Sequence, residues 1–167
     1  MIFSNIQLGI NAQIDPSTSI NNVTIGANVK IAKLCSIFGS ANYPLIIGDN
    51  CYIGMLSILN GFSNQLIIGD RVSIAQRVNI MADSGPNASP ALQRLFPIES
   101  KPVTIHNDCW IGANCVILPG ASLGDFCVVA ANSCVKDCFA PYSVIGGNPA
   151  KLIRTFSNEE IEKLIRG

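Results

Sequence analysis

The sequence predicts an all-β solenoid in which three short strands make each coil and the coils stack into a triangular prism. Three observations lead to this class: a six-residue repeat led by an aliphatic residue, a second period of about three such repeats, and insertions confined to one place in that second period. An ordinary β-sandwich with chance spacings of six is the alternative, but a phased repeat of this length is typical of solenoids. All 167 residues (1–167) are expected to form one domain.

The six-residue repeat is clearest from Ile25 onward. An aliphatic residue leads each hexad, a small residue often follows, and a small or medium apolar residue stands fifth. The leading residues are Ile25, Ile31, Ile47, Ile53, Ile68, Ile74, Ile105, Ile111, Ile117, Leu123, Val129 and Val135. Because neighbouring coils stack at strand spacing, about 4.8 Å, these side chains are expected to form ladders inside the prism. Glycine is expected to supply the unusual dihedral angles of the corners.

The second period places the loops. Triplets of hexads start at residues 25, 47, 68, 105 and 123, and the residues in excess of three hexads always fall in the third hexad. Loops are therefore expected to leave the prism at one edge only. We expect coils over 8–140, with Leu8–Thr24 as a less regular first coil. The longest inserted loop is expected at 81–102, and a C-terminal extension at 141–167.

Composition narrows the class of protein. The chain is 49% apolar and only 13% charged, which excludes a disordered protein. Eleven basic residues balance eleven acidic ones, so no nucleic-acid partner is expected. No run approaches the roughly 18 apolar residues of a membrane-spanning helix. The start, Met-Ile-Phe-Ser-Asn, lacks the basic region of a signal peptide, so a cytoplasmic protein is expected.

Five of the seven cysteines stand fifth in their hexads, the place that valine, alanine and serine fill elsewhere. They are Cys35, Cys51, Cys109, Cys115 and Cys127. A cysteine that alternates with such residues is a small core hydrophobe. The sequence contains no Cys-x-x-Cys pair and only one histidine, so neither disulfides nor a metal site is expected.

The C-terminal residues change to a helical pattern. Ser157 and Glu160 make a capping box, and Ile161, Leu164 and Ile165 follow at helical spacing. A short terminal helix that covers one end of the prism is predicted, where it would block an open strand edge.

Two stretches carry a resemblance to a known family. They are Asn107-Asp-Cys-Trp-Ile-Gly-Ala-Asn-Cys-Val-Ile-Leu-Pro-Gly120 and Val144-Ile-Gly-Gly-Asn-Pro-Ala-Lys-Leu-Ile-Arg154. The chain resembles the hexapeptide-repeat acyltransferases, among them the galactoside, maltose, xenobiotic and bacterial surface-sugar acetyltransferases. The resemblance implies a left-handed parallel β-helix and a homotrimer with active sites in the grooves between neighbouring prisms. It also implies acyl transfer from acetyl-coenzyme A to a hydroxyl or amine.

The resemblance implies cofactor contacts at Ala113, Ala131, Lys136, Lys151 and Arg154. The repeat agrees in part, because Ala113 and Ala131 hold the same place in neighbouring coils, where small side chains would admit a thin pantetheine arm. Backbone N–H groups along it would stabilise the oxyanion of the tetrahedral intermediate. The three basic residues are candidates for phosphate contacts, against the alternative of solvated surface cations.

The inserted loop departs from the family pattern. Four prolines stiffen it, and long ordered loops on a repeat scaffold tend to be functional. The resemblance implies a catalytic histidine here, but the loop begins Ala82-Asp-Ser-Gly-Pro-Asn87, with Ser84 or Gly85 in the histidine's place. His106 is the only histidine, and it is expected to be an ordinary surface residue rather than a relocated base.

Asp83 and Asn87 are the candidate catalytic residues of the loop. For Asp83 the alternative is a loop carboxylate that caps its own backbone. A missing histidine favours an amine acceptor, because a neutral amine attacks a thioester without a base on the protein, and Asp83 or Asn87 would position it. The carbohydrate-contacting asparagine and aspartate of the galactoside enzyme align with Met55 and Ser63, so the resemblance does not imply its substrate. Asn60 and Asn64 are nearby polar substitutes at best.

An acetyl-coenzyme A-dependent acetyltransferase is therefore expected, acting on an amino or hydroxyl group of a sugar or nucleotide-linked sugar without a metal. A metal-dependent relative on the same prism, such as a gamma-type carbonic anhydrase, would need three histidines around zinc. A catalytically silent trimeric scaffold or binding protein is the remaining alternative. The sequence leaves open the acceptor, the acyl chain length and the choice between O- and N-acylation.

Overall fold

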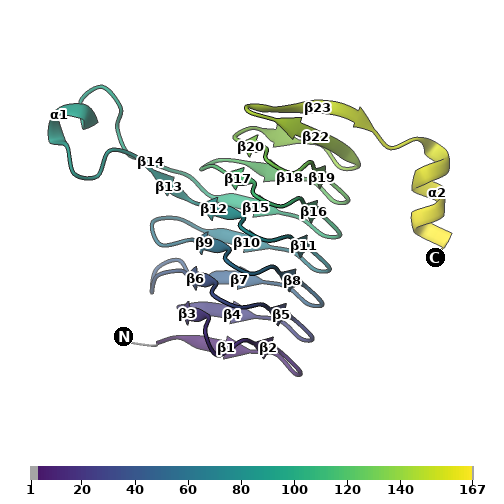
Figure 1. Cartoon of the computed structure of the whole chain (residues 1–167), viewed down its shortest axis with the longest axis horizontal. Helices are drawn as coiled ribbons and strands as arrows, with labels where there is room; N and C mark the ends of the chain where they lie inside the picture. The colour runs from purple at the N-terminus through teal and green to yellow at the C-terminus, as the bar shows by residue number, and fades with distance from the viewer. Residues whose placement is uncertain (1–3, 167) are drawn as a thin grey trace.

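The computed structural model describes residues 4–166 and shows a parallel β-helix of triangular cross-section (Figure 1). Met1–Phe3, which entered the argument against a signal peptide, and Gly167 lie outside the described residues. Each coil contributes one strand to each of three flat sheets, so the predicted left-handed β-helix of hexapeptide repeats is confirmed. No helix among the described residues is long and apolar enough to cross a membrane.

Each of the three sheets forms one face of the prism. Sheet A contains β1 (Ile6–Leu8), β4 (Val23–Ile25), β7 (Leu45–Ile47), β10 (Leu66–Ile68), β15 (Val103–Ile105), β18 (Ser122–Leu123) and β21 (Cys138–Phe139). Sheet B contains β2 (Gln13–Ile14), β5 (Lys30–Ile31), β8 (Tyr52–Ile53), β11 (Ser73–Ile74), β16 (Trp110–Ile111), β19 (Val128–Val129), β22 (Ser143–Gly147) and β23 (Ala150–Thr155). Sheet C contains β3 (Ser19–Asn21), β6 (Ser36–Phe38), β9 (Ile58–Asn60), β12 (Asn79–Met81), β17 (Val116–Ile117) and β20 (Cys134–Val135).

The aliphatic residues that lead the hexads form the core. All twelve are at most 3% exposed. In the parallel register of sheet A, Ile25 lies opposite Ile47, and Ile68 lies opposite Ile105. Burying one such side chain stabilises a protein by about 1.5–3 kcal/mol. The first coil is less regular, as predicted: it begins at Ile6 rather than Leu8, and Leu8 is 53% exposed.

The fifth-place cysteines are buried in the same core, and all seven cysteines are free thiols. The Sγ of Cys51 lies 3.0 Å from the carbonyl oxygen of Gly69 in the next coil. Burial raises the pKa of the Cys51 thiol and of the Cys115 thiol, so both stay protonated and behave as small apolar residues. The interpretation of these cysteines as core residues is confirmed.

The corners of the prism turn on the fourth residue of a hexad. Asn28, Asn50 and Asn114 have positive φ values of 56°, 57° and 61°, in the left-handed region that asparagine tolerates better than most residues. Equivalent asparagines also bond to one another between coils: Asn28 Nδ2 donates to Asn50 Oδ1 at 3.2 Å, and Asn114 Nδ2 donates to Asn132 Oδ1 at 2.7 Å. Gly120, fourth in its hexad, has a φ of 86°, so glycine supplies the corner conformation there as expected. At the other corners the fourth residue is asparagine or another residue such as Leu34 or Arg71.

Second-place glycines serve the close stacking of coils instead. A Cβ on Gly48 would lie 2.7 Å from the carbonyl carbon of Gly69, and a Cβ on Gly54 would lie 2.5 Å from the carbonyl carbon of Ala75. These distances leave no room for a side chain. The glycines are required because the backbone of the next coil lies against them.

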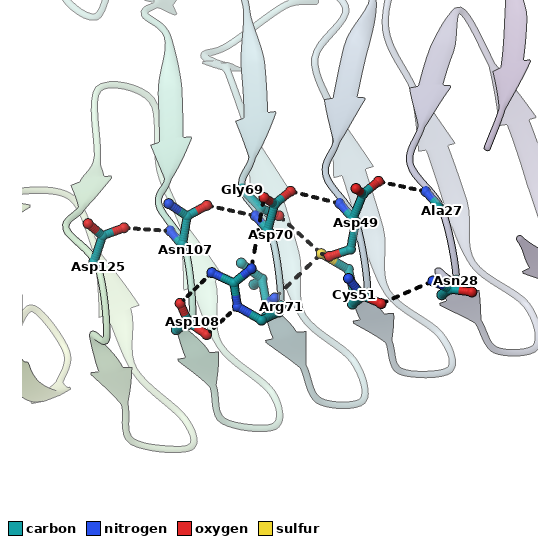
Figure 2. Close-up of polar contacts among 12 residues, drawn as sticks. Ala27, Asn28, Asp49, Cys51, Gly69, Asp70, Arg71, Asn107, Asp108 and Asp125 are labelled. Atoms are coloured by element: carbon teal, nitrogen blue, oxygen red, sulfur yellow. Dashed lines mark hydrogen bonds and ion pairs between the residues drawn. The ribbon is translucent and has the colours of Figure 1, made fainter. Parts of the chain in front are cut away.

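A ladder of side chains ties the coils together at the edge between sheets A and B (Figure 2). Asp49 Oδ1 accepts a hydrogen bond from the backbone N–H of Ala27 at 2.7 Å, and Asp70 Oδ1 accepts one from Asp49 at 2.8 Å. Asn107 Oδ1 accepts from the N–H of Asp70, and Asp125 Oδ1 from the N–H of Asn107, both at 2.9 Å. We call this set the acidic ladder. It fixes each coil to the next in one register.

The inserted segments all leave the prism between sheets C and A, as predicted. They are 39–44, 61–65 and 82–102. The longest forms an antiparallel ribbon of β13 (Asp83–Ser84) and β14 (Glu99–Ser100), followed outward by α1 (Pro90–Gln93), and projects from the prism as an arm (Figure 1).

The C-terminal end is covered differently from the prediction. The edge of β22 pairs with the antiparallel strand β23, which therefore closes this side of sheet B. Helix α2 (Asn158–Arg166) lies beside the prism rather than over its end (Figure 1), and its Leu164 and Ile165 are 42% and 74% exposed. The short terminal helix is confirmed, but its expected role as the end cap is wrong, because the hairpin already pairs the open edge.

The acidic ladder gives a first testable prediction. We expect Asp70→Ala to lower the free energy of unfolding by about 1 kcal/mol, because the N–H of Asp49 loses its acceptor. For a chain of this size that corresponds to a fall of about 2–4 °C in the melting temperature. Asp70→Asn is the matched control, because Asn107 performs the same role in the next coil. Thermal unfolding in which Ala and Asn substitutions lower the melting temperature equally would contradict the ladder's role.

Candidate active site

The candidate residues lie on two edges of the prism. The loop edge, between sheets C and A, carries the inserted segments and therefore Asp83, together with Lys136 near the C-terminal end. The smooth edge, between sheets B and C, carries Ala113 and Ala131. In one chain, sheet C separates these two edges.

Asp83 begins the arm, and two side chains of the preceding coil hold its carboxylate. Asn60 Nδ2 donates to Asp83 Oδ1 at 3.0 Å, and Ser63 Oγ donates to Asp83 Oδ2 at 3.1 Å. Asp83 is half-buried. The carboxylate is thus oriented by another coil, whereas the alternative interpretation had it capping its own backbone. Hydrogen-bond donors on both oxygens fix the direction in which the remaining lone pairs point.

The stem of the arm is fixed to the loop at 61–65. Ser100 lies opposite Asp83 in the β13–β14 ribbon, and its Oγ donates to the carbonyl oxygen of Ser63 at 3.0 Å. Asn64 Nδ2 approaches Ser100 Oγ at 3.4 Å. The arm therefore leaves the prism from a fixed base, and Asp83 lies in that base rather than in the projecting part.

Asn87 lies further out and is exposed. Its backbone N–H donates to the carbonyl oxygen of Gly85 at 2.9 Å, and its own carbonyl accepts from Gln93 Nε2 at 3.3 Å. These bonds hold the fold of the arm. The structure does not include the Asn87 side chain in the hydrogen bonds around Asp83, although the sequence suggested the two residues together.

Ala113 and Ala131 stack in neighbouring coils, as the repeat implied. The backbone N–H of Asn132 donates to the carbonyl oxygen of Ala113 at 2.9 Å. Gly112 adds to the flatness of this strip, because a Cβ there would lie 2.6 Å from the backbone nitrogen of Ala131. Ala131 is exposed and Ala113 half-buried, so the smooth edge offers a strip of backbone with little side chain in front of it.

The basic candidates differ in what already binds them. Lys136 is exposed, and the exposed Lys151 has its Nζ 3.8 Å from Asp137 Oδ2, a distance typical of a weak surface pair. Lys151 lies opposite Gly146 in the β22–β23 hairpin, at the C-terminal end of the prism. Both lysines can therefore bind an anion without first breaking a strong ion pair.

Arg154, in contrast, is engaged with helix α2. Its guanidinium donates to both oxygens of Glu160, at 2.8 and 2.9 Å, and lies 5.6 Å from the ring centroid of Phe156. Glu160 also accepts from the backbone N–H of Ser157 at 2.7 Å, which confirms the capping box. The hydrogen bonds from Arg154 and then from Ser157 lower the pKa of the Glu160 carboxyl to about 2.

His106 lies on the third edge, between sheets A and B, and is exposed. The structure therefore does not bring it to Asp83, in agreement with its interpretation as a surface residue. Among residues 4–166, no group of three or more histidine, cysteine, aspartate or glutamate side chains is placed to hold a metal ion.

The sequence placed Asn60 and Ser63 near the acceptor but did not reveal that they bind the carboxylate of Asp83. They stand 23 and 20 residues before Asp83 and meet it only because the coils stack. The repeat places Asn60 at the end of a third-hexad strand, one coil below the start of the arm. A search for polar residues one coil before Asp83 would therefore have identified Asn60.

The repeats match two known families. Residues 102–137 match the bacterial transferase hexapeptide (six repeats), and residues 44–63 match the hexapeptide repeat of succinyl-transferase. A probable macrolide acetyltransferase from Lysinibacillus sphaericus is 39% identical over 125 residues, which are 73% of this chain and 66% of that protein. The galactoside O-acetyltransferase of Escherichia coli is 31% identical over 138 residues, which are 82% of this chain and 66% of that protein. The chain thus spans slightly less than two thirds of these relatives.

Solved structures share the architecture. AntD, an N-acyltransferase from Bacillus cereus, superimposes with a TM-score of 0.81 at 23% identity, over 96% of this chain and 88% of that one. A hexapeptide-repeat acetyltransferase from Vibrio cholerae, complexed with acetyl-coenzyme A, gives a TM-score of 0.57 at 27% identity, over 91% of this chain and 72% of that one. The fold and the repeats define a left-handed β-helix protein built on hexapeptides. Within that class, the chain carries hexapeptide repeats of the bacterial transferases and is similar to the acetyltransferases built on them.

The pair of Arg154 and Glu160 gives a pH prediction. Because the folded-state pKa of Glu160 is about 2, below the ordinary value of 4.5, the pair stabilises the attachment of α2 above pH 4.5, and this contribution is lost as the pH falls from 4.5 towards 2. A carboxyl-carbon NMR titration should place the midpoint of Glu160 near 2, and Arg154→Ala should move it towards 4.5. The exposed Glu162 is an internal reference. A Glu160 midpoint that Arg154→Ala leaves unchanged would contradict this account.

Proposed function

We propose that this protein transfers an acetyl group from acetyl-coenzyme A to an amino or hydroxyl group of a sugar-containing acceptor. The observation that carries the proposal is the Asp83 carboxylate, oriented through both oxygens at the base of the arm. Support also comes from the relatives, which are acetyltransferases by name, and from the Vibrio cholerae structure, which is complexed with acetyl-coenzyme A. AntD is complexed with an amino-sugar nucleotide and coenzyme A.

We further propose that the working unit is a homotrimer. Sheet C separates Asp83 on the loop edge from Ala113 and Ala131 on the smooth edge of the same chain. A second copy that sets its smooth edge against the loop edge of the first would bring the two halves together. Three copies repeat this contact around a closed ring, so every loop edge meets a smooth edge. We place this reaction in the cytoplasm as part of the proposal.

Acyl transfer then needs few groups from the protein. The acceptor nitrogen or oxygen attacks the thioester carbonyl carbon, and the new bond forms as the carbonyl oxygen becomes an oxyanion. Backbone N–H groups along the smooth edge would stabilise that oxyanion. Its collapse breaks the carbon–sulfur bond, and the leaving thiolate takes up the proton that the acceptor loses. Asp83 would accept a hydrogen bond from the acceptor and hold it in line with the thioester.

The role of Asp83 predicts a loss of turnover in Asp83→Asn. The substitution keeps the shape of the side chain but removes the charge, and we expect kcat to fall by about 10²-fold or more with coenzyme A affinity unchanged. Steady-state kinetics with acetyl-coenzyme A and a panel of amino sugars would measure this. His106→Ala is the control and should change kcat by no more than a few fold.

The pH profile separates two roles for Asp83. With an amine acceptor that attacks in its neutral form, the rising limb of kcat/KM should follow the pKa of that amine and move when the amine is changed. A limb that stays fixed across acceptors of different basicity would assign the titrating group to the protein and refute substrate-assisted transfer.

The cations at the C-terminal end give a prediction for cofactor binding. Lys151→Ala should weaken coenzyme A binding by about 1.5–3 kcal/mol, the scale of a charge-assisted hydrogen bond, and should hardly change pantetheine binding. Arg154→Ala should weaken coenzyme A binding by less, because Arg154 must break its ion pair with Glu160 to reach a phosphate. Calorimetric titration measures both, with Lys163→Ala on α2 as the control.

Equal losses for coenzyme A and pantetheine would mean that Lys151 acts through folding. If coenzyme A does not bind the wild-type protein, the silent scaffold becomes the better interpretation.

A further inference from the structure

A groove of about 370 Å³ runs beside the loop edge, over the outer side of sheet C in the first three coils. Phe38 and Phe62 supply its apolar walls, from the second and third coils, whereas Ile20 of the first coil packs against the core. The other lining residues are asparagines, serines, a glycine and the buried Ile37, and none of the lining residues is charged. Phe62 is 59% exposed, so a large apolar surface faces this groove without cover from residues 4–166.

The oriented carboxylate does not line this groove but is linked to its wall by hydrogen bonds. Asn60 connects them: its Oδ1 accepts from the backbone N–H of Phe62 at 2.9 Å, and its Nδ2 donates to Asp83 at 3.0 Å. Phe38 lies opposite Asn60 in the register of β6 and β9, and its carbonyl oxygen accepts from the N–H of Gly61 at 2.8 Å. A molecule that presents its amine or hydroxyl to Asp83 would therefore extend along the groove towards Phe38.

The chemistry of the walls selects the kind of molecule. A diphosphate buried against uncharged walls would lose its hydration, and no cation in the groove would compensate for that loss. The phosphates of a nucleotide-linked sugar therefore do not fit here. Two aromatic rings with a few amides and hydroxyls instead suit an apolar group that carries few polar atoms, as is common in small-molecule sites. The volume is at the lower end of the usual range for such sites, which is about 300–1,000 Å³.

We propose that this groove binds the uncharged, apolar part of the acceptor, such as the aryl or alkyl aglycone of a glycoside, while the sugar presents its amine or hydroxyl to Asp83. The inference rests on the proposed function for its orientation but not for the binding itself. It narrows the acceptor to a glycoside with an apolar aglycone and excludes nucleotide-linked sugars from this subsite.

Binding of matched glycosides to the full-length protein, without acetyl-coenzyme A, tests this directly. The probes are the methyl glycoside of glucosamine, its phenyl glycoside and the uridine diphosphate ester of glucosamine. We expect the phenyl glycoside to bind about 10-fold more tightly than the methyl glycoside in calorimetric titration, and the nucleotide ester to bind no better than the methyl glycoside. Phe62→Ala should abolish the preference for phenyl, and Tyr52→Ala, an exposed aromatic residue on sheet B, should keep it.

The outcomes separate this inference from the proposed function. Equal binding of the two glycosides, no binding of either, or a preference that survives Phe62→Ala would overturn the groove's role. If the wild-type protein is a trimer and Phe62→Ala dissociates it in light scattering, a second copy of the chain occupies the groove and the inference also fails. A phenyl preference in a protein that transfers no acetyl group would support the groove and refute the acyltransferase. Transfer without a phenyl preference would do the opposite.

Discussion

Close stacking of one coil on the next is the constraint on which the rest of this structure depends. It requires glycines such as Gly48 and Gly54, because the backbone of the next coil leaves no room for a Cβ. It also requires corners that turn within a few residues, which fourth-place residues in the left-handed conformation, such as Asn28 and Gly120, supply. With those conditions met, the leading aliphatic side chains meet inside the prism and each loop can only leave at an edge.

The stacking of coils also orients the side chains of the candidate active site. Asn60 and Asp83 belong to different coils and meet because β9 and β12 pair in register, so the orientation of the carboxylate depends on the scaffold as much as on the arm. The pairing of β6 with β9 sets Phe38, which lines the apolar groove, beside Asn60, which binds the carboxylate. A rigid prism with a fixed arm is suited to acyl transfer, because the protein then contributes mainly orientation and an oxyanion environment.

The fold was predictable because aliphatic residues recur every six positions in the sequence. Leading residues such as Ile53 and Leu123 are buried as expected. The role of the second-place glycines was not predictable, because periodicity does not show which atoms of neighbouring coils approach each other. The position of α2 was not predictable either, because the repeat does not show that β23 pairs the open edge. At the site, the loop pointed to Asp83, but its partners lie about a coil earlier in the chain. Likewise, the motif marked Arg154 as a candidate for phosphate contacts, but it did not reveal that its guanidinium is paired with Glu160.

The central claim is that two chains complete one acyl-transfer site, with the smooth edge of one copy set against the loop edge of the other. A crystal structure with coenzyme A bound tests it most directly. The account predicts that the pantetheine arm lies along Ala113 and Ala131 of one copy, with its sulfur directed at Asp83 of the neighbouring copy. A cofactor that contacts a single chain, or whose sulfur lies away from every Asp83, would contradict the account.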